Sequence, residues 1–193
     1  MARVPYVDPE TFPGDRGLLE TSMDDDDLPE PYREVFSTGT RHVHRAIGNS
    51  PAMLGGFRES NATVWGESGL TERERELTIL AVARASDSRY EWHQHVRHGL
   101  SVGLTPDEIR AVGREAYDGF DDEEAALLAY ASATARGTVD DGTFDRFAER
   151  FDRETVVGAT MLAGSYAGLA RSLDAMGVGP EEAFVGWDLA ELR

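Results

Sequence analysis

The sequence predicts an all-α protein, a bundle of about seven or eight helices. From Pro31 onward, apolar residues recur at spacings of three and four over most of the chain, which is the period of an amphipathic helix. Two segments match the capping box that starts many helices: Thr71 with Glu74, and Thr105 with Glu108. No segment of useful length alternates apolar and polar residues, so the pattern predicts no β-sheet.

The first three expected helices lie in the amino-terminal half. Residues 31–47 carry apolar side chains at helical spacing and are followed by glycine and asparagine, which end helices. The second helix begins at Pro51, because proline is favoured in the first turn, and it runs to Gly66. Thr71 caps the third helix, whose segment 77–85 is almost wholly apolar. We therefore expect the third helix at the centre of the core.

Five more helices are expected in the remainder of the chain. A break at 86–88 separates the third helix from the fourth, and the fifth begins at Pro106. The sixth has acidic residues in its first turn and arginine in its last, which matches the helix dipole. The last carries a single apolar stripe. The ranges predicted for the four longer helices are 89–101, 121–136, 140–151 and 153–176.

The chain divides into an arm and one domain. Residues 1–30 are rich in proline, glycine and aspartate and lack helical periodicity. We expect them to form an extended arm that is ordered only where it lies on the body or on a neighbouring subunit. Its acidic run, Asp24–Asp27, is predicted to be a solvated loop rather than a cation site. Residues 31–193 are predicted to form a single helical domain.

The composition excludes several classes of function. The chain has 36 acidic and 19 basic residues and a formal charge of −17; every basic side chain is arginine, and cysteine is absent. The lack of cysteine excludes disulfide, thiol, zinc–thiolate and iron–sulfur chemistry within this chain. An evenly acidic surface argues against nucleic-acid and anionic-membrane partners. Molar salt screens the self-repulsion of such a surface, so we expect the cytoplasmic protein of a halophile.

Neither a leader nor a membrane span is expected. The residues that follow Met1 lead into polar residues and form no continuous apolar run, which predicts no secretory signal. The longest apolar stretch without a charge is 155–170. It is shorter than the roughly 20 residues that a spanning helix needs. We interpret it as a buried helix of a soluble protein.

Histidines and glutamates mark the candidate chemistry. In the second of two histidine clusters, Glu91, His95 and His98 stand four and three residues apart and share a helix face. His93 points nearly opposite, so the three histidines do not form one site. A hairpin through the break brings Glu76 of the preceding helix toward His95, if the two helices pack antiparallel.

A carboxylate beside an imidazole suits proton transfer, because the carboxylate fixes the tautomer of the ring. The plainer interpretation is a surface histidine beside a helix salt bridge. A third interpretation is a metal site, because His95 and His98 with Glu91 or Glu76 are ligand types for zinc, manganese or iron.

The first histidine cluster is predicted to be structural. His42 and His44 lie two residues apart, so they face different ways on a helix. Either could reach a pocket from a neighbouring subunit. Arg41 and Arg45 are expected to pair with acidic side chains on the surface.

Three segments of the chain resemble the carboxymuconolactone decarboxylase family, within the superfamily of alkylhydroperoxidase D-like proteins. They are 70–77, 90–95 and 103–109. The resemblance implies an all-helical fold built on a helical hairpin and assembled as dimers, trimers or hexamers. In the peroxidase branch a glutamate, a C-x-x-C pair and a histidine form a proton relay. The glutamate falls on Glu76 and the histidine on His95, but Ser88 and Glu91 occupy the cysteine positions.

The resemblance therefore favours the decarboxylase branch, which lacks the cysteine pair. That branch removes CO2 from a carboxylated unsaturated lactone and uses no cofactor. The resemblance implies His95 as general acid, Glu76 as its orienting partner and Glu91 as a second carboxylate. The residues expected to bind substrate are Arg89, Trp92 and Tyr166, and the arginine candidates for its carboxylate are Arg45, Arg75, Arg84, Arg89 and Arg97. A non-catalytic oligomer that binds a small molecule is the alternative.

Overall fold

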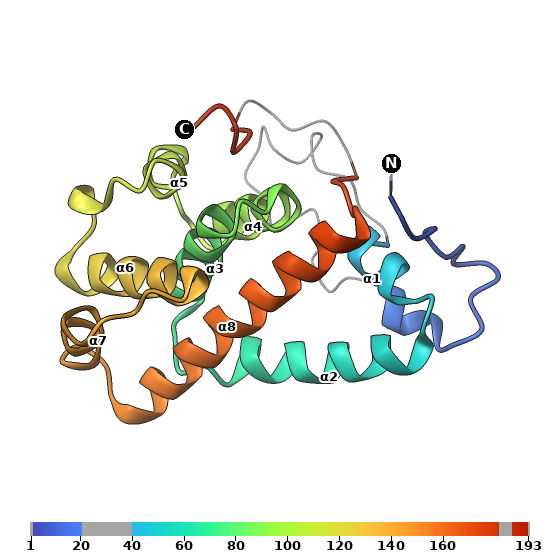
Figure 1. Cartoon of the computed structure of the whole chain (residues 1–193), viewed down its shortest axis with the longest axis horizontal. Coiled ribbons are helices and arrows are strands. Elements are labelled where there is room, and N and C mark those ends of the chain that lie inside the picture. The colour runs from blue at the N-terminus through green and yellow to red at the C-terminus, as the bar shows by residue number, and fades with distance from the viewer. Residues whose placement is uncertain (1, 21–39, 182–186, 193) are drawn as a thin grey trace.

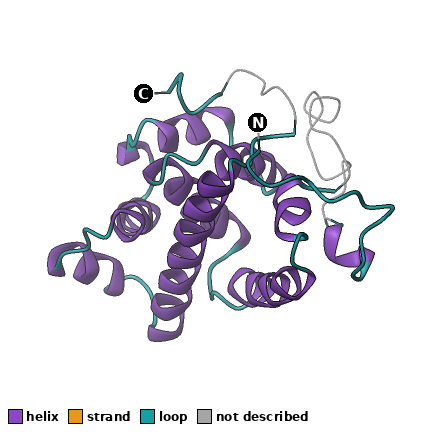
Figure 2. Cartoon of the chain, turned by 45° about the vertical axis from the view of Figure 1, so that its right-hand side comes forward, coloured by secondary structure: helices purple, strands orange, loops and turns teal. Residues whose placement is uncertain are grey.

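The computed structural model describes residues 2–20, 40–181 and 187–192, and these ranges contain eight α-helices and no strand (Figures 1 and 2). The helices are α1 (His42–Ile47), α2 (Pro51–Gly66), α3 (Glu72–Ala85), α4 (Arg89–Ser101), α5 (Pro106–Gly113), α6 (Asp122–Arg136), α7 (Asp141–Ala148) and α8 (Arg153–Met176). Single-turn 3₁₀ helices lie at Arg16–Leu19 and Tyr117–Gly119. The predicted all-α fold is confirmed.

The central helix is α3, as predicted, because its middle carries apolar side chains on every face. The side chains from Leu77 to Ala83 are between 0% and 1% exposed. Helices α4, α6 and α8 pack around it (Figure 1). Its start is the predicted capping box: the Thr71 hydroxyl accepts the Glu74 N–H at 3.3 Å, and the Glu74 carboxylate accepts the Thr71 N–H at 2.7 Å.

Helices α3 and α4 form a hairpin across the predicted break. Asp87 adopts a left-handed backbone conformation, with φ of 56°, which reverses the chain within three residues. Ser88 then caps α4 by accepting the N–H of Glu91 at 3.4 Å. Because α4 folds back along α3, residues at similar distances from the turn face one another.

Helix α8 runs across the molecule and closes the core over α3 (Figure 1). Its predicted stripe buries Leu162, Tyr166 and Leu173, which are at most 4% exposed. Gly158 allows the backbone at Ser68 to approach α8 closely. A Cβ added at this position would lie only 2.2 Å from the carbonyl oxygen of Ser68. Among the described helices, α8 included, none has both the length and the apolar character to cross a membrane.

The first helix is shorter than predicted. The range 31–47 was expected to be one helix, but α1 begins at His42, and Arg41 has extended backbone, with φ of −76° and ψ of 144°. A residue far along the chain contacts the first residue of α1: the His42 N–H donates to the carboxylate of Glu181 at 2.6 Å. No local sequence pattern shows such a contact. Residues 31–39 lie outside the described residues.

The described part of the amino-terminal arm, 2–20, lies against the body. The Arg3 N–H donates to the Met176 carbonyl at 2.8 Å, and the Val7 N–H donates to the Arg45 carbonyl at 3.1 Å. Leu19 is only 1% exposed. The acidic run 24–27 lies outside the described residues. The division of the chain into an arm, 1–30, and a single helical domain, 31–193, stays a prediction.

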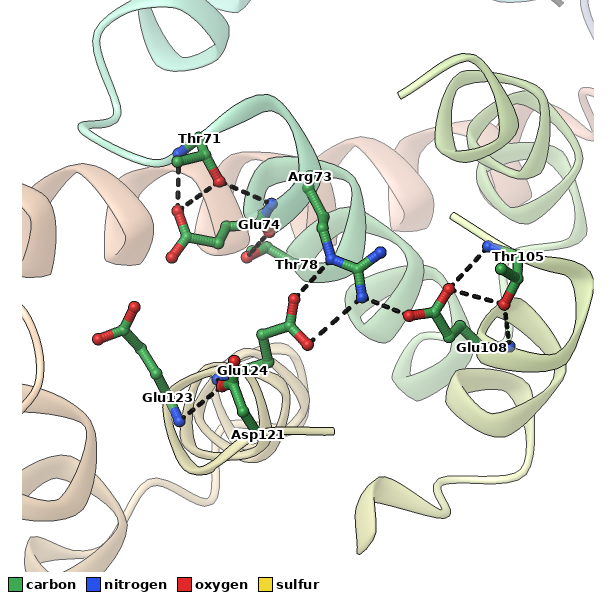
Figure 3. Close-up of polar contacts among 9 residues, drawn as sticks. All are labelled: Thr71, Arg73, Glu74, Thr78, Thr105, Glu108, Asp121, Glu123 and Glu124. Atoms are coloured by element: carbon green, nitrogen blue, oxygen red, sulfur yellow. Dashed lines mark hydrogen bonds and ion pairs between the residues drawn. The ribbon is translucent and has the colours of Figure 1, made fainter. Parts of the chain in front are cut away.

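One guanidinium links three helices at the edge of the core (Figure 3). Arg73 of α3 donates to Glu124 of α6 at 2.7 Å and to Glu108 of α5 at 2.5 Å. The hydrogen bond from Arg73 is the main reason that the pKa of Glu108 falls from its ordinary 4.5 to about 2. Glu108 also closes the predicted capping box of α5 with Thr105.

We expect Arg73→Met to lower the free energy of unfolding by about 1–2 kcal/mol, because two partly exposed charged hydrogen bonds are lost. Glu108 has a depressed pKa, so its stabilisation is complete above pH 4.5 and disappears as the pH falls toward 2. Urea unfolding over this range measures the difference from the unaltered protein. Arg16→Met is the matched control, since Arg16 pairs with Glu10 on an exposed surface. A difference that stays constant down to pH 2 contradicts the prediction.

Candidate active site

The α3–α4 hairpin brings Glu76 and His95 into direct contact. His95 Nδ1 lies 2.8 Å from Glu76 Oε2, and the Glu76 side chain is fully buried. A carboxylate at this distance accepts the Nδ1–H, so the other ring nitrogen, Nε2, is free to exchange a proton. The contact between Glu76 and His95, which the sequence permitted but did not require, is therefore present in the fold.

A second carboxylate faces the other nitrogen of the same ring. Glu91, one turn before His95 on α4, places Oε2 at 3.7 Å from His95 Nε2. Burial raises the pKa of Glu91 from 4.5 to about 7; the nearby His95 opposes this rise and the charge of Glu181 adds to it. The imidazole thus lies between two buried carboxyl groups, one of which titrates near neutral pH.

Aromatic side chains pack against this imidazole. The Tyr166 ring meets it edge-on, with centroids 5.1 Å apart, and Trp65 lies 5.7 Å away. The guanidinium of Arg75 lies 4.4 Å from the Trp65 ring centroid and 3.5 Å from Glu76 Oε1. Burial holds the pKa of Tyr166 well above its ordinary value, so this hydroxyl stays protonated.

His98, one turn after His95, stays uncharged. The two rings have centroids 5.3 Å apart. Burial, His95 and the guanidinium groups of Arg41 and Arg75 hold the pKa of His98 well below 6.5. His98 therefore offers a neutral polar ring to the site, while His95 carries the contacts to carboxylates.

These groups open into a cavity of about 320 Å³. Its basic, acidic and imidazole lining residues are Arg41, His44, Arg58, Glu91, His95 and His98. Arg58 approaches His44 Nε2 at 3.2 Å, while His44 Nδ1 lies 3.3 Å from the Leu19 carbonyl. Since Arg58 can only donate, Nε2 accepts and Nδ1 carries the proton. Burial and Arg58 lower the pKa of His44 to about 4, so this ring is neutral.

Of the three residues predicted to bind substrate, only Tyr166 lines this cavity. Arg89 is instead paired with Asp188 and is largely exposed. The Trp92 indole N–H donates to the Trp187 carbonyl at 2.8 Å, and its ring packs in the core. The expectation that Arg89 and Trp92 border the site of His95 therefore needs correction.

The other arginine candidates lie elsewhere too, apart from Arg75 beside Glu76. Arg45 donates to the Val7 carbonyl and Arg84 to the Gly113 carbonyl, both outside the cavity. Arg97 is 1% exposed and does not line the cavity.

Sequence reasoning missed the two arginines that do line it. Arg41 was expected on the surface, yet it is 7% exposed and belongs to the cavity wall. Arg58 was not singled out. A signal for it exists, because Arg58, Asn61 and Trp65 stand three and four residues apart and so share one face of α2. His44, expected to be structural, also lines the cavity.

The metal-site alternative lacks geometric support. In the part of the chain that the structure describes, no three histidine, aspartate or glutamate side chains lie in an arrangement that could hold a metal ion. The ring nitrogens of His95 already face Glu76 and Glu91, which places the two carboxylates on opposite sides of the ring.

The fold is of the alkylhydroperoxidase D-like type. The structure of the debrominase Bmp8 with 2,3,4-tribromopyrrole matches with a TM-score of 0.70 and 16% identity, over 80% of this chain and 84% of that one. An alkylhydroperoxidase AhpD core protein from Ralstonia eutropha matches with a TM-score of 0.66 and 17% identity, over 85% and 92%. A protein of unknown function from Agrobacterium tumefaciens matches with a TM-score of 0.62 and 19% identity, over 70% of this chain and 94% of that one.

A family model matches part of the sequence. Residues 51–133 match the model of the carboxymuconolactone decarboxylase family. No curated protein matches the chain. The matched segment holds Glu76, Glu91 and His95, whereas Arg41, His44 and Tyr166 of the cavity wall lie outside it.

Proposed function

We propose that this protein is a cofactor-independent enzyme that transfers protons on a small carboxylated, lactone-like substrate, with decarboxylation as its reaction. The observation that carries the proposal is the Glu76–His95–Glu91 group, buried in a cavity that also presents Arg41 and Arg58. Buried acid–base groups beside fixed cations are the equipment that such a reaction requires.

In the proposed reaction the bond between the substrate carbon and its carboxyl group breaks and CO2 leaves. The electron pair remains in the substrate as a dienolate, which must then take up a proton. His95 donates that proton from Nε2, and Glu76 at Nδ1 stabilises the charged ring. Glu91, 3.7 Å from Nε2, restores the proton, because its pKa of about 7 keeps a protonated fraction at neutral pH.

The two cavity arginines are the proposed partners of the substrate's oxygen atoms. A guanidinium binds a carboxylate through paired hydrogen bonds. Arg41 and Arg58 both line the cavity, and the neutral rings of His44 and His98 add no competing charge. This local positive charge matters because the chain as a whole carries −17.

We expect Arg58→Met to raise KM for the carboxylated substrate by about 10–100-fold and to change kcat much less, because a charged hydrogen bond contributes about 1.5–3 kcal/mol to binding. Methionine keeps the apolar length of the side chain. Steady-state kinetics measures both constants, with Arg16→Met as the control at a distant exposed pair. An unchanged KM removes Arg58 from the substrate site.

Release of CO2 from 4-carboxymuconolactone, in molar salt, tests the proposed reaction. Molar salt is chosen because it screens the repulsion between an acidic protein and an anionic substrate. Turnover by the unaltered protein that is lost in His95→Gln supports the proposal. Folded protein without turnover contradicts it, and binding without turnover favours the alternative of a non-catalytic small-molecule-binding protein.

We also propose a homo-oligomer that works in a salt-rich cytoplasm. The acidic, lysine-free composition supports the salt requirement. Met53, Val157 and Met161 are 67%, 63% and 56% exposed in the single chain, and burial against another copy removes this apolar surface from water. Light scattering in molar and in dilute salt measures the assembly; a monomer under both conditions contradicts it.

A further inference from the structure

A short strap of chain after α8 returns to the candidate site. Gly177 ends α8 in the left-handed conformation, with φ of 68°. Val178 is 9% exposed and packs in the apolar cluster that contains Val43 and Tyr90. The Gly179 carbonyl lies 2.8 Å from His42 Nδ1, which donates to it. The strap is therefore held against α1 and α4 before it reaches Glu181.

The carboxylate of Glu181 accepts three hydrogen bonds. Its donors are the N–H of His42 at 2.6 Å, the hydroxyl of Tyr90 at 2.8 Å and the amide of Gln94 at 2.5 Å. Tyr90 and Gln94 are 3% and 8% exposed, and both line the cavity. On α4 they stand one residue before and three residues after Glu91, so Glu181 holds the wall on both sides of that carboxyl group.

We propose that Glu181 is a positioning residue of the acid–base site: it fixes Tyr90 and Gln94 in the cavity wall on either side of Glu91, and it brings a negative charge to that wall. The inference rests on the proposed function, in which Glu91 supplies a proton to His95. Glu181 lies outside the segment 51–133 that matches the family model.

The negative charge of Glu181 acts on the pKa of Glu91 together with two other effects. Burial is the largest cause of the raised pKa of Glu91; His95 opposes it, and Glu181 adds to it. Other titratable and charged groups face the site from each element packed around it. They are Arg41 and His44 at α1, Arg58 on α2, Arg75 and Glu76 on α3, Tyr90 and His98 on α4, and Tyr166 on α8. Glu181 is the carboxylate whose negative charge raises the pKa of Glu91 in addition to the effect of burial.

The test follows the ionisation of Glu91 directly, by infrared spectroscopy of its protonated carboxyl group over a pH series. The band is assigned by its loss in Glu91→Gln. We expect Glu181→Gln and Glu181→Ala to move the midpoint to lower pH, because a neighbouring negative charge is removed. Glu181→Asp keeps the charge, so its midpoint is expected to lie close to that of the unaltered protein. Asp188→Asn is the control, since Asp188 lies on the same carboxy-terminal stretch and pairs with Arg89.

The outcomes separate a positioning role from a purely structural one. If Glu181→Gln, Glu181→Ala and Glu181→Asp all titrate like the unaltered protein, the proposal is wrong. If the aspartate variant shifts as far as the other two, the charge of Glu181 is not what acts. The infrared titration needs no substrate, so it reads Glu181 even if no decarboxylation is found. Where turnover is found, the pH profile of kcat/KM must shift in the same direction as the band.

Discussion

The His95→Gln variant is expected to lose about 10²–10⁴ of kcat/KM for decarboxylation, because general acid catalysis by a positioned side chain contributes an effect of this size. Glutamine retains hydrogen-bonding capacity toward Glu76, so the fold of the α3–α4 hairpin should survive. It cannot deliver a proton from the position of Nε2, which is the atom that faces Glu91. Steady-state kinetics on the folded variant gives the loss.

His93→Gln is the matched control for this loss. His93 lies on the same helix and is 7% exposed, but it does not line the cavity. The substitution removes a buried imidazole without touching the proposed relay. Equal activity in His95→Gln and the unaltered protein assigns the chemistry to another residue, whereas an equal loss in both variants points to a folding defect rather than to catalysis.

The Glu76–His95 contact could be approached from the sequence because it depends on local signals. The capping box at Thr71, the break at 86–88 and the apolar centre of α3 fix a hairpin, and a hairpin relates positions by their distance from its turn. The same arithmetic could have excluded Arg89, which stands about 120° around α4 from His95. That position directs its side chain toward Asp188 instead of the cavity.

The rest of the site was beyond local patterns because it joins segments far apart in the chain. Arg41 enters the cavity from extended backbone just before α1, in a region where the sequence predicted a continuing helix. Glu181 meets the His42 N–H across 139 positions of sequence. Such contacts follow from the packing of α1 and the strap on α4, and neither periodicity nor capping motifs contain that information.

The absence of cysteine acquires a structural meaning at α4. By the resemblance to the peroxidase branch, Ser88 and Glu91 stand at the two positions of its cysteine pair. Ser88 serves as the cap of α4, and it accepts the backbone N–H of Glu91. Glu91 contributes a carboxyl group that titrates near neutrality beside His95. One position thus makes a backbone contact, and the other offers the carboxyl group that the proposed proton transfer uses.

Glu91→Gln is expected to abolish the pH dependence of the reaction near neutrality and to make the protein more stable in alkaline solution. In the proposed reaction Glu91 acts while protonated, so the rate should fall as the pH rises through about 7. Glutamine cannot supply a proton, and we expect a loss of about 10²–10⁴-fold at neutral pH with no such fall. A pH–rate profile of kcat/KM measures both effects.

The stability effect has the opposite sign and rests on the same carboxyl group. Because burial raises the pKa of Glu91 from 4.5 to about 7, the folded state binds this proton more tightly than the unfolded state, and the associated stability is lost as the pH rises through that interval. Glutamine stays neutral, so the variant should gain about 1–3 kcal/mol over the unaltered protein between acid and alkaline conditions. Urea unfolding below and above the interval gives the difference. A gain that does not grow with pH means that Glu91 is ionised in the folded protein throughout, and it removes Glu91 from the relay.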